Sequence, residues 1–313
     1  MVFYFERKWI MAYKERCESV ELRKFRILNS RMMLKESEKK YYLGLEKGYT
    51  GEVMFDRLTE KLTSDSLILN DLLLEVNNTS FQLDSTMIYQ ECIHLFEIKN
   101  YEGDYIFDPK TERFYTKIRK EIKDPLDQLK RGESLLRQFL QNHGYNFPIV
   151  PHLVFIHPNF ILYQAPLDKP IIFYSQLDSF MKKLINTLSR LTTYHKRLAE
   201  KLVTMHQTES SNTKVPKYHY VSLKKGPTCG ICKSFSVTSG VKRIVCNDCG
   251  HQESIESAIL RNVEEIKLLF PDMKIMTNVV FEWCGGIWSK KTIRGGLKKN
   301  LILNGNTKGA FFE

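Results

Sequence analysis

The sequence predicts an α/β core followed by a small cysteine module and a basic, helix-rich unit. Three observations support this order: helix-like and strand-like segments alternate up to about residue 205, two CxxC pairs lie 13 residues apart, and positive charge gathers after residue 213. The chain has 313 residues, of which 42% are hydrophobic and 12% aromatic, which is typical of a folded protein with more than one domain.

The N-terminal part is predicted to be helical. The segment from Arg7 to about Lys47 is charged and poor in Gly and Pro, which favours one or two surface helices ending at Gly48–Gly51. A further helix is expected from Glu52 to about Leu62, where apolar residues recur close to helical spacing, and a strand from Ser66 to Val76.

The next elements complete the α/β pattern. They are, in order, strands at Ser80–Tyr89 and Cys92–Tyr101, a helix at Leu126–Leu140 with Pro125 in its first turn, a strand at Ile149–Ile156, and a helical segment at Gln176–Met205. The order of helix, strands, helix and strand fits an α/β core better than an all-α or all-β one.

The first two of these strands form a predicted hairpin that carries candidate catalytic residues. A loop of Gln90-Glu91 makes opposed residue numbers sum to 181, so that Asp84 faces Glu97 and Gln82 faces Lys99. Opposed residues share a face with Cβ atoms about 5 Å apart, and two carboxylates held this way repel by on the order of a kcal/mol unless a cation lies between them. Two carboxylates, a metal ion and an ammonium group indicate metal-dependent phosphodiester chemistry.

Four cysteines predict a structural zinc site. The two CxxC pairs flank strand-like residues, and four thiolates at this spacing can converge tetrahedrally on Zn²⁺. Unrelated thiols and a redox CxxC are the alternatives, although a redox motif comes singly at the start of a helix. The predicted ligands are Cys229, Cys232, Cys246 and Cys249.

The C-terminal unit is predicted to be helical and basic. Helices are expected at about 254–270 and 274–284, then from the N-cap Ser289, and a hairpin around Asn304-Gly305 follows. This order suggests a winged helix-turn-helix, and the alternative is a capping unit with a solvated basic face. The nucleic-acid-binding candidates are Lys290, Lys291, Arg294, Lys298 and Lys299.

The charge of the chain points to a polyanionic partner. The formal net charge is +11, and the part from Lys214 onward has 16 Lys/Arg against 8 Asp/Glu, which leaves +8 there. No apolar run approaches the roughly 20 residues of a membrane helix, and the first residues lack a cleavable signal pattern. We therefore expect a cytoplasmic protein with a nucleic-acid partner, most simply DNA, and no membrane; protein partners are not indicated.

Four motifs occur in order along the first half of the chain: Gly48-Tyr-Thr-Gly-Glu52, Gln82-Leu-Asp84, Glu97-Ile-Lys-Asn-Tyr-Glu-Gly103 and Asp124-Pro-Leu-Asp-Gln128. Together they resemble the nuclease-related domain (NERD) family, which is assigned to the PD-(D/E)xK nuclease-like superfamily. The resemblance covers roughly Leu43 to Val154, and the flanking helical segments are similar to bacterial multidomain members. It implies a restriction-endonuclease-like mixed sheet flanked by helices.

The resemblance also implies roles for individual residues. Asp84 and Glu97 would bind Mg²⁺ or Mn²⁺, Lys99 would lie near the attacked phosphate, Glu52 would be a helix-borne acid, and Gln128 a polar orienter. Hard oxygen ligands suit Mg²⁺ independently of the family. One departure is Asp124, which stands where the family has Asn, and this change is expected to affect only the start of the helix.

Each of these residues also has an ordinary structural interpretation. Glu97 and Lys99 could form a surface pair on a strand, Glu52 could favour a helix N-terminus, and Gln128 could be a surface glutamine. Three hypotheses follow: a metal-dependent deoxyribonuclease, an inactive nuclease fold that binds DNA or assembles a complex, and an RNA-processing nuclease. Cys92 and Cys284 are expected to be packed thiols, and the histidines His94, His152 and His157 are expected to be structural.

The expected domain boundaries follow from composition. They are a helical segment at 1–47, the nuclease-like domain at 48–206, a linker at 207–226, the zinc ribbon at 227–252 and the basic unit at 253–313.

Overall fold

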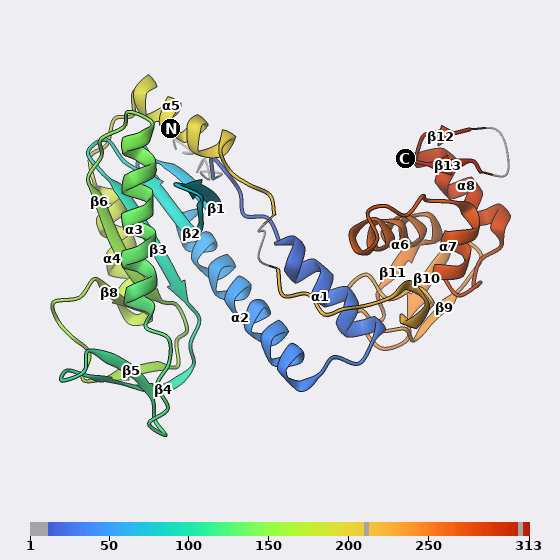
Figure 1. The fold of residues 1–313 in the computed structure, drawn as a ribbon, viewed down its shortest axis with the longest axis horizontal. Helices are drawn as coiled ribbons and strands as arrows, with labels where there is room; N and C mark the ends of the chain where they lie inside the picture. Colours follow the sequence, from blue (N-terminus) through green and yellow to red (C-terminus); the bar gives the residue numbers. More distant parts are fainter. Residues whose placement is uncertain (1–11, 210–212, 306–308) are drawn as a thin grey trace, which may run out of the picture. The chain divides into compact units, whose positions relative to one another are not determined.

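A computed structural model describes residues 12–209, 213–305 and 309–313 (Figure 1). The chain divides into two compact units. The first consists of Met1–Ser19 and Leu43–Asn212, and the second of Val20–Tyr42 and Thr213–Glu313.

The first unit is built on a five-stranded mixed sheet with the strand order β1-β2-β3-β6-β8. Its strands are β1 (Leu67–Val76), β2 (Thr79–Ile88), β3 (Ile93–Lys99), β6 (Ile149–Phe155) and β8 (Ile171–Phe173). The β1–β2 and β2–β3 pairs are antiparallel, whereas β3–β6 and β6–β8 are parallel. The predicted mixed-sheet α/β fold is therefore confirmed.

Helices cover both faces of this sheet. One face packs against α3 (Pro125–Asn142) and α5 (Thr193–Thr204), and the other against α4 (Tyr174–Asn186) and the C-terminal half of α2 (Glu36–Thr59). The alternation along β3 shows the two layers, because Leu95 belongs to the core under α3 and Phe96 to the core under α2 and α4. Figure 1 shows α3 lying along the sheet.

Helix α2 differs from the prediction because it does not break at Gly48–Gly51. A β-carbon on Gly48 would meet no atom within 4 Å, whereas one on Gly51 would lie 2.5 Å from Asn100 Cβ. Gly51 therefore permits close packing of the helix on the end of β3, and this packing outweighs the roughly 1 kcal/mol that a glycine costs in a helix.

The described part of the N-terminal segment also differs from the prediction. Residues 12–18 are extended rather than helical, and the predicted residues 7–11 lie outside the described part of the chain. Lys14 forms an isolated parallel bridge with Leu69: its N–H donates to Ile68 O and its carbonyl accepts from Asn70 N. This segment thus occupies the free edge of β1, which satisfies strand hydrogen bonds that a local helix would leave open.

A second small sheet was not predicted. It has the order β5-β4-β7 and consists of β4 (Gly103–Asp108), β5 (Arg113–Thr116) and β7 (Phe160–Tyr163). These strands are short and carry many polar residues, so their periodicity is weak in the sequence. They bring the segment before α3 next to the end of β3.

The second unit contains a helical core and a three-stranded sheet of order β11-β10-β9. Its elements are α1 (Val20–Arg31), the 3₁₀ turn η1 (Tyr220–Ser222), β9 (Val237–Ser239), β10 (Arg243–Cys246), β11 (Gln252–Ser254), α6 (Ile255–Leu269), α7 (Thr277–Trp283), α8 (Lys290–Asn300), β12 (Leu303–Asn304) and β13 (Phe311–Phe312). Leu223 is buried in this core, so the chain just before the zinc module packs on the unit.

The helix boundaries of this unit follow their capping residues. Ser254 and Ser289 cap α6 and α8 through their side chains, as the sequence indicates for Ser289. Helix α7 begins at Thr277 rather than near Lys274, because Ile275 forms a bridge with Phe312 of the terminal hairpin. Over the described ranges, no helix combines the length and apolarity needed to cross a bilayer.

Candidate active site and zinc site

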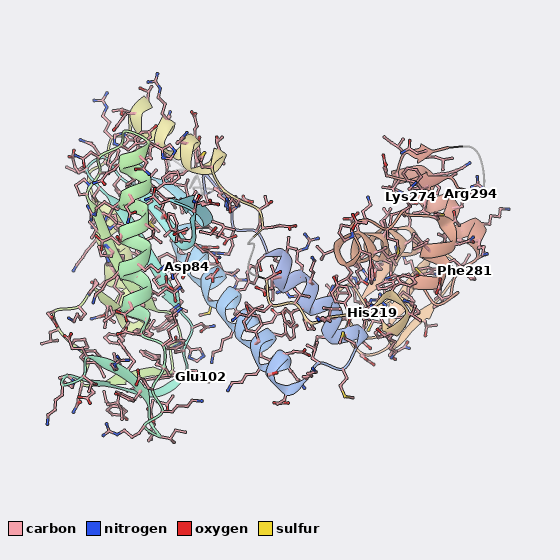
Figure 2. All side chains as sticks on the ribbon, viewed as in Figure 1. Asp84, Glu102, His219, Lys274, Phe281 and Arg294 are labelled. Carbon is pink, nitrogen blue, oxygen red and sulfur yellow. The ribbon has the colours of Figure 1, made fainter. Side chains whose placement is uncertain are left out.

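Asp84, which is labelled in Figure 2, belongs to β2. At this residue β2 loses its regular partners on both sides. The β1–β2 pairing passes from Asn70↔Ser85 to Leu72↔Leu83, so that Asp84 and Asp71 fall between the paired positions, and Asp71 has φ +55°. The β2–β3 pairing ends at Ser85. This pairing has the predicted register, because Ser85 opposes Phe96.

Side-chain groups replace the missing strand hydrogen bonds at Asp84. The Ile98 N–H donates to Asp84 Oδ2 at 2.7 Å, and Arg16 Nη2 donates to the Asp84 carbonyl at 2.7 Å. The Asp84 side chain is therefore fixed beside β3 in a residue that is only 7% exposed. The predicted neighbour of Lys99, Gln82, instead donates to Asp71 Oδ1 at 2.7 Å.

Glu97, Lys99 and Gln128 form a hydrogen-bonded group next to Asp84. Lys99 Nζ donates to Glu97 Oε1 at 2.5 Å and to Gln128 Oε1 at 3.0 Å. Glu97 and Lys99 lie two residues apart on β3, so they share the face that packs towards α3. Gln128 is in the first turn of α3, where Asp124 caps the helix by accepting from Leu126 N at 2.8 Å.

Glu52 approaches this group from α2. Gly51 packs against Asn100, whose Nδ2 donates to the Lys47 carbonyl at 2.8 Å. Gly51 directly precedes Glu52, and Asn100 directly follows Lys99. The contact between Gly51 and Asn100 therefore sets the distance between the helix and the strand that carry these candidates.

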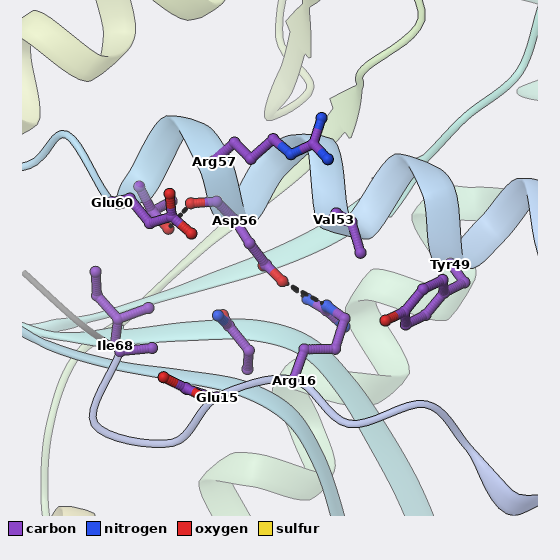
Figure 3. Close-up of a pocket in the computed structure, with 11 residues that line it drawn as sticks. Glu15, Arg16, Tyr49, Val53, Asp56, Arg57, Glu60 and Ile68 are labelled. Atoms are coloured by element: carbon purple, nitrogen blue, oxygen red, sulfur yellow. Dashed lines mark hydrogen bonds and ion pairs between the residues drawn. The ribbon is translucent and has the colours of Figure 1, made fainter. Parts of the chain in front are cut away.

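Arg16 is a site residue that sequence analysis missed. Its guanidinium donates to Glu52 Oε2 at 2.5 Å, to Asp56 Oδ2 and Oδ1 at 2.7 and 3.0 Å, and to the Asp84 carbonyl. Only 3% of its side chain is exposed, and it lies in the wall of a hollow of ≈ 390 Å³ (Figure 3). It comes from the N-terminal segment, where an isolated arginine carries no sequence signal.

Burial and mutual repulsion make these carboxylates hard to ionise. Burial, with the charge of Asp84, raises the pKa of Glu97 from its ordinary 4.5 to about 8, against the opposing charge of Lys99. The pKa of Glu52 rises to about 8 for the same reasons, against Arg16. Burial also raises the pKa of Asp84. The pKa of Lys99 is raised because Glu97 and Asp84 outweigh its burial.

This donor set fits a hard divalent cation. Asp84 Oδ1 and Glu97 Oε2 accept no hydrogen bond from any residue that the structure describes, and both residues are at most 7% exposed. Buried carboxylate oxygens that repel one another are suitable ligands for Mg²⁺ or Mn²⁺, because the cation removes the repulsion.

The histidines pack as structural residues near the opposite face of β3. His94 Nδ1 and His152 Nε2 are 2.9 Å apart, and both rings contact Phe96. Burial lowers the pKa of His94, and it lowers that of His152 to about 3, so both rings are neutral at pH 7.

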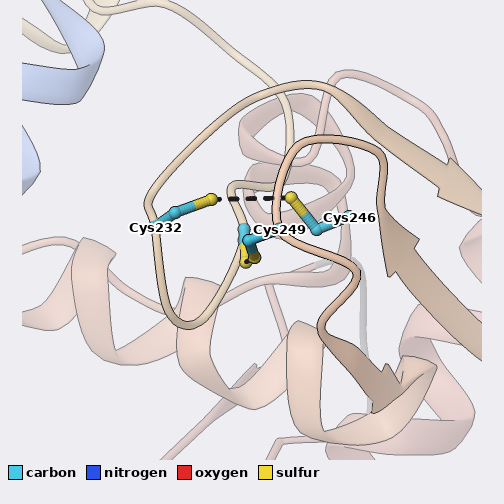
Figure 4. A group of neighbouring side chains, drawn as sticks. Cys232, Cys246 and Cys249 are labelled. Carbon is cyan, nitrogen blue, oxygen red and sulfur yellow. Dashed lines mark hydrogen bonds between the residues drawn. The ribbon is translucent and has the colours of Figure 1, made fainter.

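The four predicted zinc ligands converge in the second unit. All four Sγ atoms lie within 4.8 Å of one another, with Cys229 and Cys249 at 3.6 Å and Cys232 and Cys246 at 3.5 Å (Figure 4). A tetrahedral zinc site with Zn–S bonds of about 2.3 Å needs sulfur atoms roughly 3.8 Å apart. The cluster therefore fits Zn²⁺, with every coordination position filled by protein.

The five basic candidates of the C-terminal unit are all exposed on α8. Buried Ile293 and Leu297 fix the opposite side of this helix in the core, and Gly296 lies against Ile259. Arg294 and Lys290 line a hollow of ≈ 540 Å³ together with the terminal hairpin, and Figure 2 shows Arg294 and Lys274 at the same end of the unit. Lys299 differs from the others because it pairs with Glu256 at 2.7 Å.

Comparison with known proteins identifies part of this architecture. No curated protein and no solved structure matches the chain. The family model of the nuclease-related domain matches residues 47–156, a range that contains Glu52, Asp84, Glu97, Lys99 and Gln128. The resemblance indicated by the four motifs is thus confirmed, and residues 47–156 of this chain are a nuclease-related domain (NERD).

Proposed function

We propose that the protein is a nuclease that uses Mg²⁺ or Mn²⁺ to hydrolyse phosphodiester bonds of DNA. The observation that carries this proposal is the position of Lys99 Nζ, which bridges Glu97 and Gln128 beside the buried carboxylate of Asp84. An inactive scaffold would gain nothing from this group, because burying the carboxylates of Asp84 and Glu97 near each other destabilises the fold unless a cation offsets their repulsion.

The proposed roles follow from the contacts. Asp84 and Glu97 would hold the metal ion, which when bound would polarise a phosphoryl oxygen and increase the acidity of water. Lys99 would stabilise the negative charge that develops on the phosphate, and Gln128 would keep the ammonium group in place. Glu52, with a pKa of about 8, can exchange a proton with the attacking water near neutral pH.

The second unit would bring the enzyme to its substrate. The four cysteines would bind structural Zn²⁺, and α8 with the terminal hairpin would act as the recognition helix and wing of a winged helix-turn-helix. Gly285 and Gly286, with φ of +62° and +70°, form the turn between α7 and α8. Cations exposed along α8 would bind phosphates, which gives affinity that falls steeply with salt.

A cleavage assay tests the catalytic proposal. We expect metal-dependent cleavage when the protein is incubated with double-stranded DNA, single-stranded DNA and RNA, and a preference for DNA. Asp84→Ala and Lys99→Ala should abolish cleavage, whereas Lys182→Ala, which removes an exposed lysine of α4, should not. Unchanged cleavage in both site variants contradicts the assignment, and a preference for RNA contradicts the substrate.

A binding assay tests the targeting role. We expect the triple variant Lys290→Ala, Lys291→Ala, Arg294→Ala to bind DNA at least about tenfold more weakly at low salt, because each cation lost removes a phosphate contact. Cleavage at saturating DNA should persist. Unchanged DNA affinity would exclude a targeting role for α8.

A further inference from the structure

A basic turn precedes the helix that carries Gln128 of the candidate active site. Residues Lys117–Lys123 read KIRKEIK, with four cations and one acid in seven positions. The segment connects β5 to α3, and α3 carries Gln128 in its first turn. The cations therefore precede, within the same connection and first helical turn, a residue that contacts Lys99.

The backbone of this segment is held by hydrogen bonds. Thr116 N donates to the Lys120 carbonyl at 2.9 Å, and Arg119 N donates to the Thr116 carbonyl at 2.8 Å. Arg119 has φ +60°, the left-handed conformation that closes a three-residue hairpin turn. Ile122 N donates to Phe114 O at 3.0 Å, which extends the hairpin. The cations are thus displayed from a defined turn.

Three of the cations are available to a polyanion. Lys117 pairs with Asp104 at 2.7 Å, and the acid Glu121 pairs with Arg113. Arg119, Lys120 and Lys123 are exposed and have no carboxylate within ion-pair distance in the described part of the chain.

Chain geometry connects this turn to the site. Lys123 directly precedes Asp124, which caps α3 by accepting from Leu126 N, and the first turn of that helix holds Gln128 against Lys99. A phosphate bound at Lys123 would therefore lie at the end of α3 that faces Lys99.

We propose that Arg119, Lys120 and Lys123 bind the DNA backbone next to the bond that is cut. The inference rests on the proposed nuclease function and adds a second nucleic-acid surface, located on the nuclease-related domain itself. In this arrangement α8 supplies general affinity, and the turn sets the register of the strand over Asp84, Glu97 and Lys99.

The test compares two triple variants of the full chain with equal loss of charge. One carries Arg119→Ala, Lys120→Ala and Lys123→Ala. The control carries Arg197→Ala, Lys196→Ala and Lys183→Ala, which removes exposed cations of α4 and α5. Binding of a short fluorescent DNA duplex is measured by anisotropy over a range of KCl concentrations without added Mg²⁺, so that the result does not depend on cleavage.

The slope of log Kd against log salt decides the proposal. We expect the slope of the turn variant to fall by about 2 to 3 relative to the unmodified chain, because each phosphate contact contributes about 0.9. The control should keep its slope within about 0.5 of the parent. Equal slopes in the two variants overturn the proposal. The proposal is also overturned if the turn variant keeps the salt slope of its DNA binding but no longer binds phosphatidylserine vesicles.

Failure of this inference is separate from failure of the nuclease assignment. If the chain binds DNA through the turn but cuts nothing, the slope still changes in the turn variant. If the chain cuts DNA without using the turn, Lys99→Ala abolishes cleavage while the slopes of the two triple variants agree.

Discussion

Gly51 of α2 and Asn100 after β3 touch so closely that a β-carbon on Gly51 would lie 2.5 Å from Asn100 Cβ. The contact joins the helix that carries Glu52 to the strand that carries Glu97 and Lys99. Asn100 Oδ1 is buried without a hydrogen-bond partner among the described residues. An unpaired buried oxygen costs about 1 to 3 kcal/mol, and the contact with Gly51 is kept despite this cost.

Replacing Gly51 should therefore disturb the site more than replacing another glycine of the same helix. Gly51→Ala should lower the free energy of unfolding by on the order of 2 kcal/mol and reduce cleavage at least about tenfold, because the helix must move away from Asn100. Gly44→Ala is the control. Its new methyl group would meet no atom within 4 Å, so it should stabilise the protein by roughly 0.5 to 1 kcal/mol. Thermal unfolding and cleavage rates of the two variants check this, and equal effects would contradict the packing role of Gly51.

Arg16 is expected to position the acidic residues rather than to touch the substrate, because only 3% of its side chain is exposed. Arg16→Lys keeps the charge but loses the fork that joins Glu52, Asp56 and the Asp84 carbonyl. We expect about a tenfold loss of cleavage and an increase in the Mg²⁺ concentration that gives half-maximal rate.

The matched control for Arg16 is Arg57→Lys, an exposed arginine that lines the same hollow. It should change neither the rate nor the Mg²⁺ requirement by more than about twofold. A purely structural role for Arg16 predicts a lower melting temperature with the same Mg²⁺ requirement, and that result would refute the positioning role.

The raised pKa of Glu97 predicts a dependence of stability on pH. Above about pH 4.5 the unfolded chain releases a proton that the folded protein retains up to about pH 8. The stabilising contribution of Glu97 to the free energy of unfolding is therefore complete at low pH. As pH rises from about 5 to 8, the metal-free protein loses this contribution, which is on the order of 2 kcal/mol. Because metal binding needs the ionised carboxylates, Mg²⁺ should raise the melting temperature more at pH 8 than at pH 6.

Differential scanning fluorimetry across this pH range measures the effect. Glu97→Gln should flatten the pH dependence and weaken the stabilisation by Mg²⁺. Glu200→Gln, at an exposed position of α5, should leave both unchanged. If Glu97→Gln shows the same pH slope as the parent protein, Glu97 is not the group that titrates.

The cysteine cluster predicts one structural zinc ion per chain. Cys232→Ser should reduce the bound zinc to near zero and loosen the sheet of β9, β10 and β11, because that sheet contributes only Ile244 to the buried apolar core of the unit. Cys17→Ser, at an exposed cysteine outside the cluster, is the control. Elemental analysis measures the zinc, and a full zinc content in Cys232→Ser would exclude the site. Mg²⁺-dependent cleavage by the first unit should survive within about threefold, since the two metal sites use different ligands.

Much of the fold follows from local sequence rules. The hairpin register was predictable because a two-residue loop fixes which residues of the two strands oppose each other, and Ser85 accordingly opposes Phe96. The four cysteines were predictable because their spacing is itself the signal of a tetrahedral site. Ser289 was predictable as a cap because its side chain supplies a local hydrogen bond.

The missed features depend on contacts between distant segments. Helix α2 continues through Gly48 and Gly51 because it packs on Asn100, about fifty positions away in the chain, and propensity alone favours a break there. Arg16 joins the site because its segment covers the edge of β1. Neither the packing of α2 on Asn100 nor the contacts of Arg16 produce a hydrophobic periodicity or a motif spacing that could be recognised in the sequence.

The interruption of β2 at Asp84 has a dynamic consequence. Amide protons exchange with solvent according to how often their hydrogen bonds open, and regular strand pairing protects them best. The Ile98 amide is protected by a carboxylate rather than by a strand carbonyl. Its exchange rate should therefore report on Asp84 directly, slowing when the carboxylate is fixed by a metal ion and rising in Asp84→Ala, while the amides of Leu95 and its neighbours in regular pairing remain unchanged.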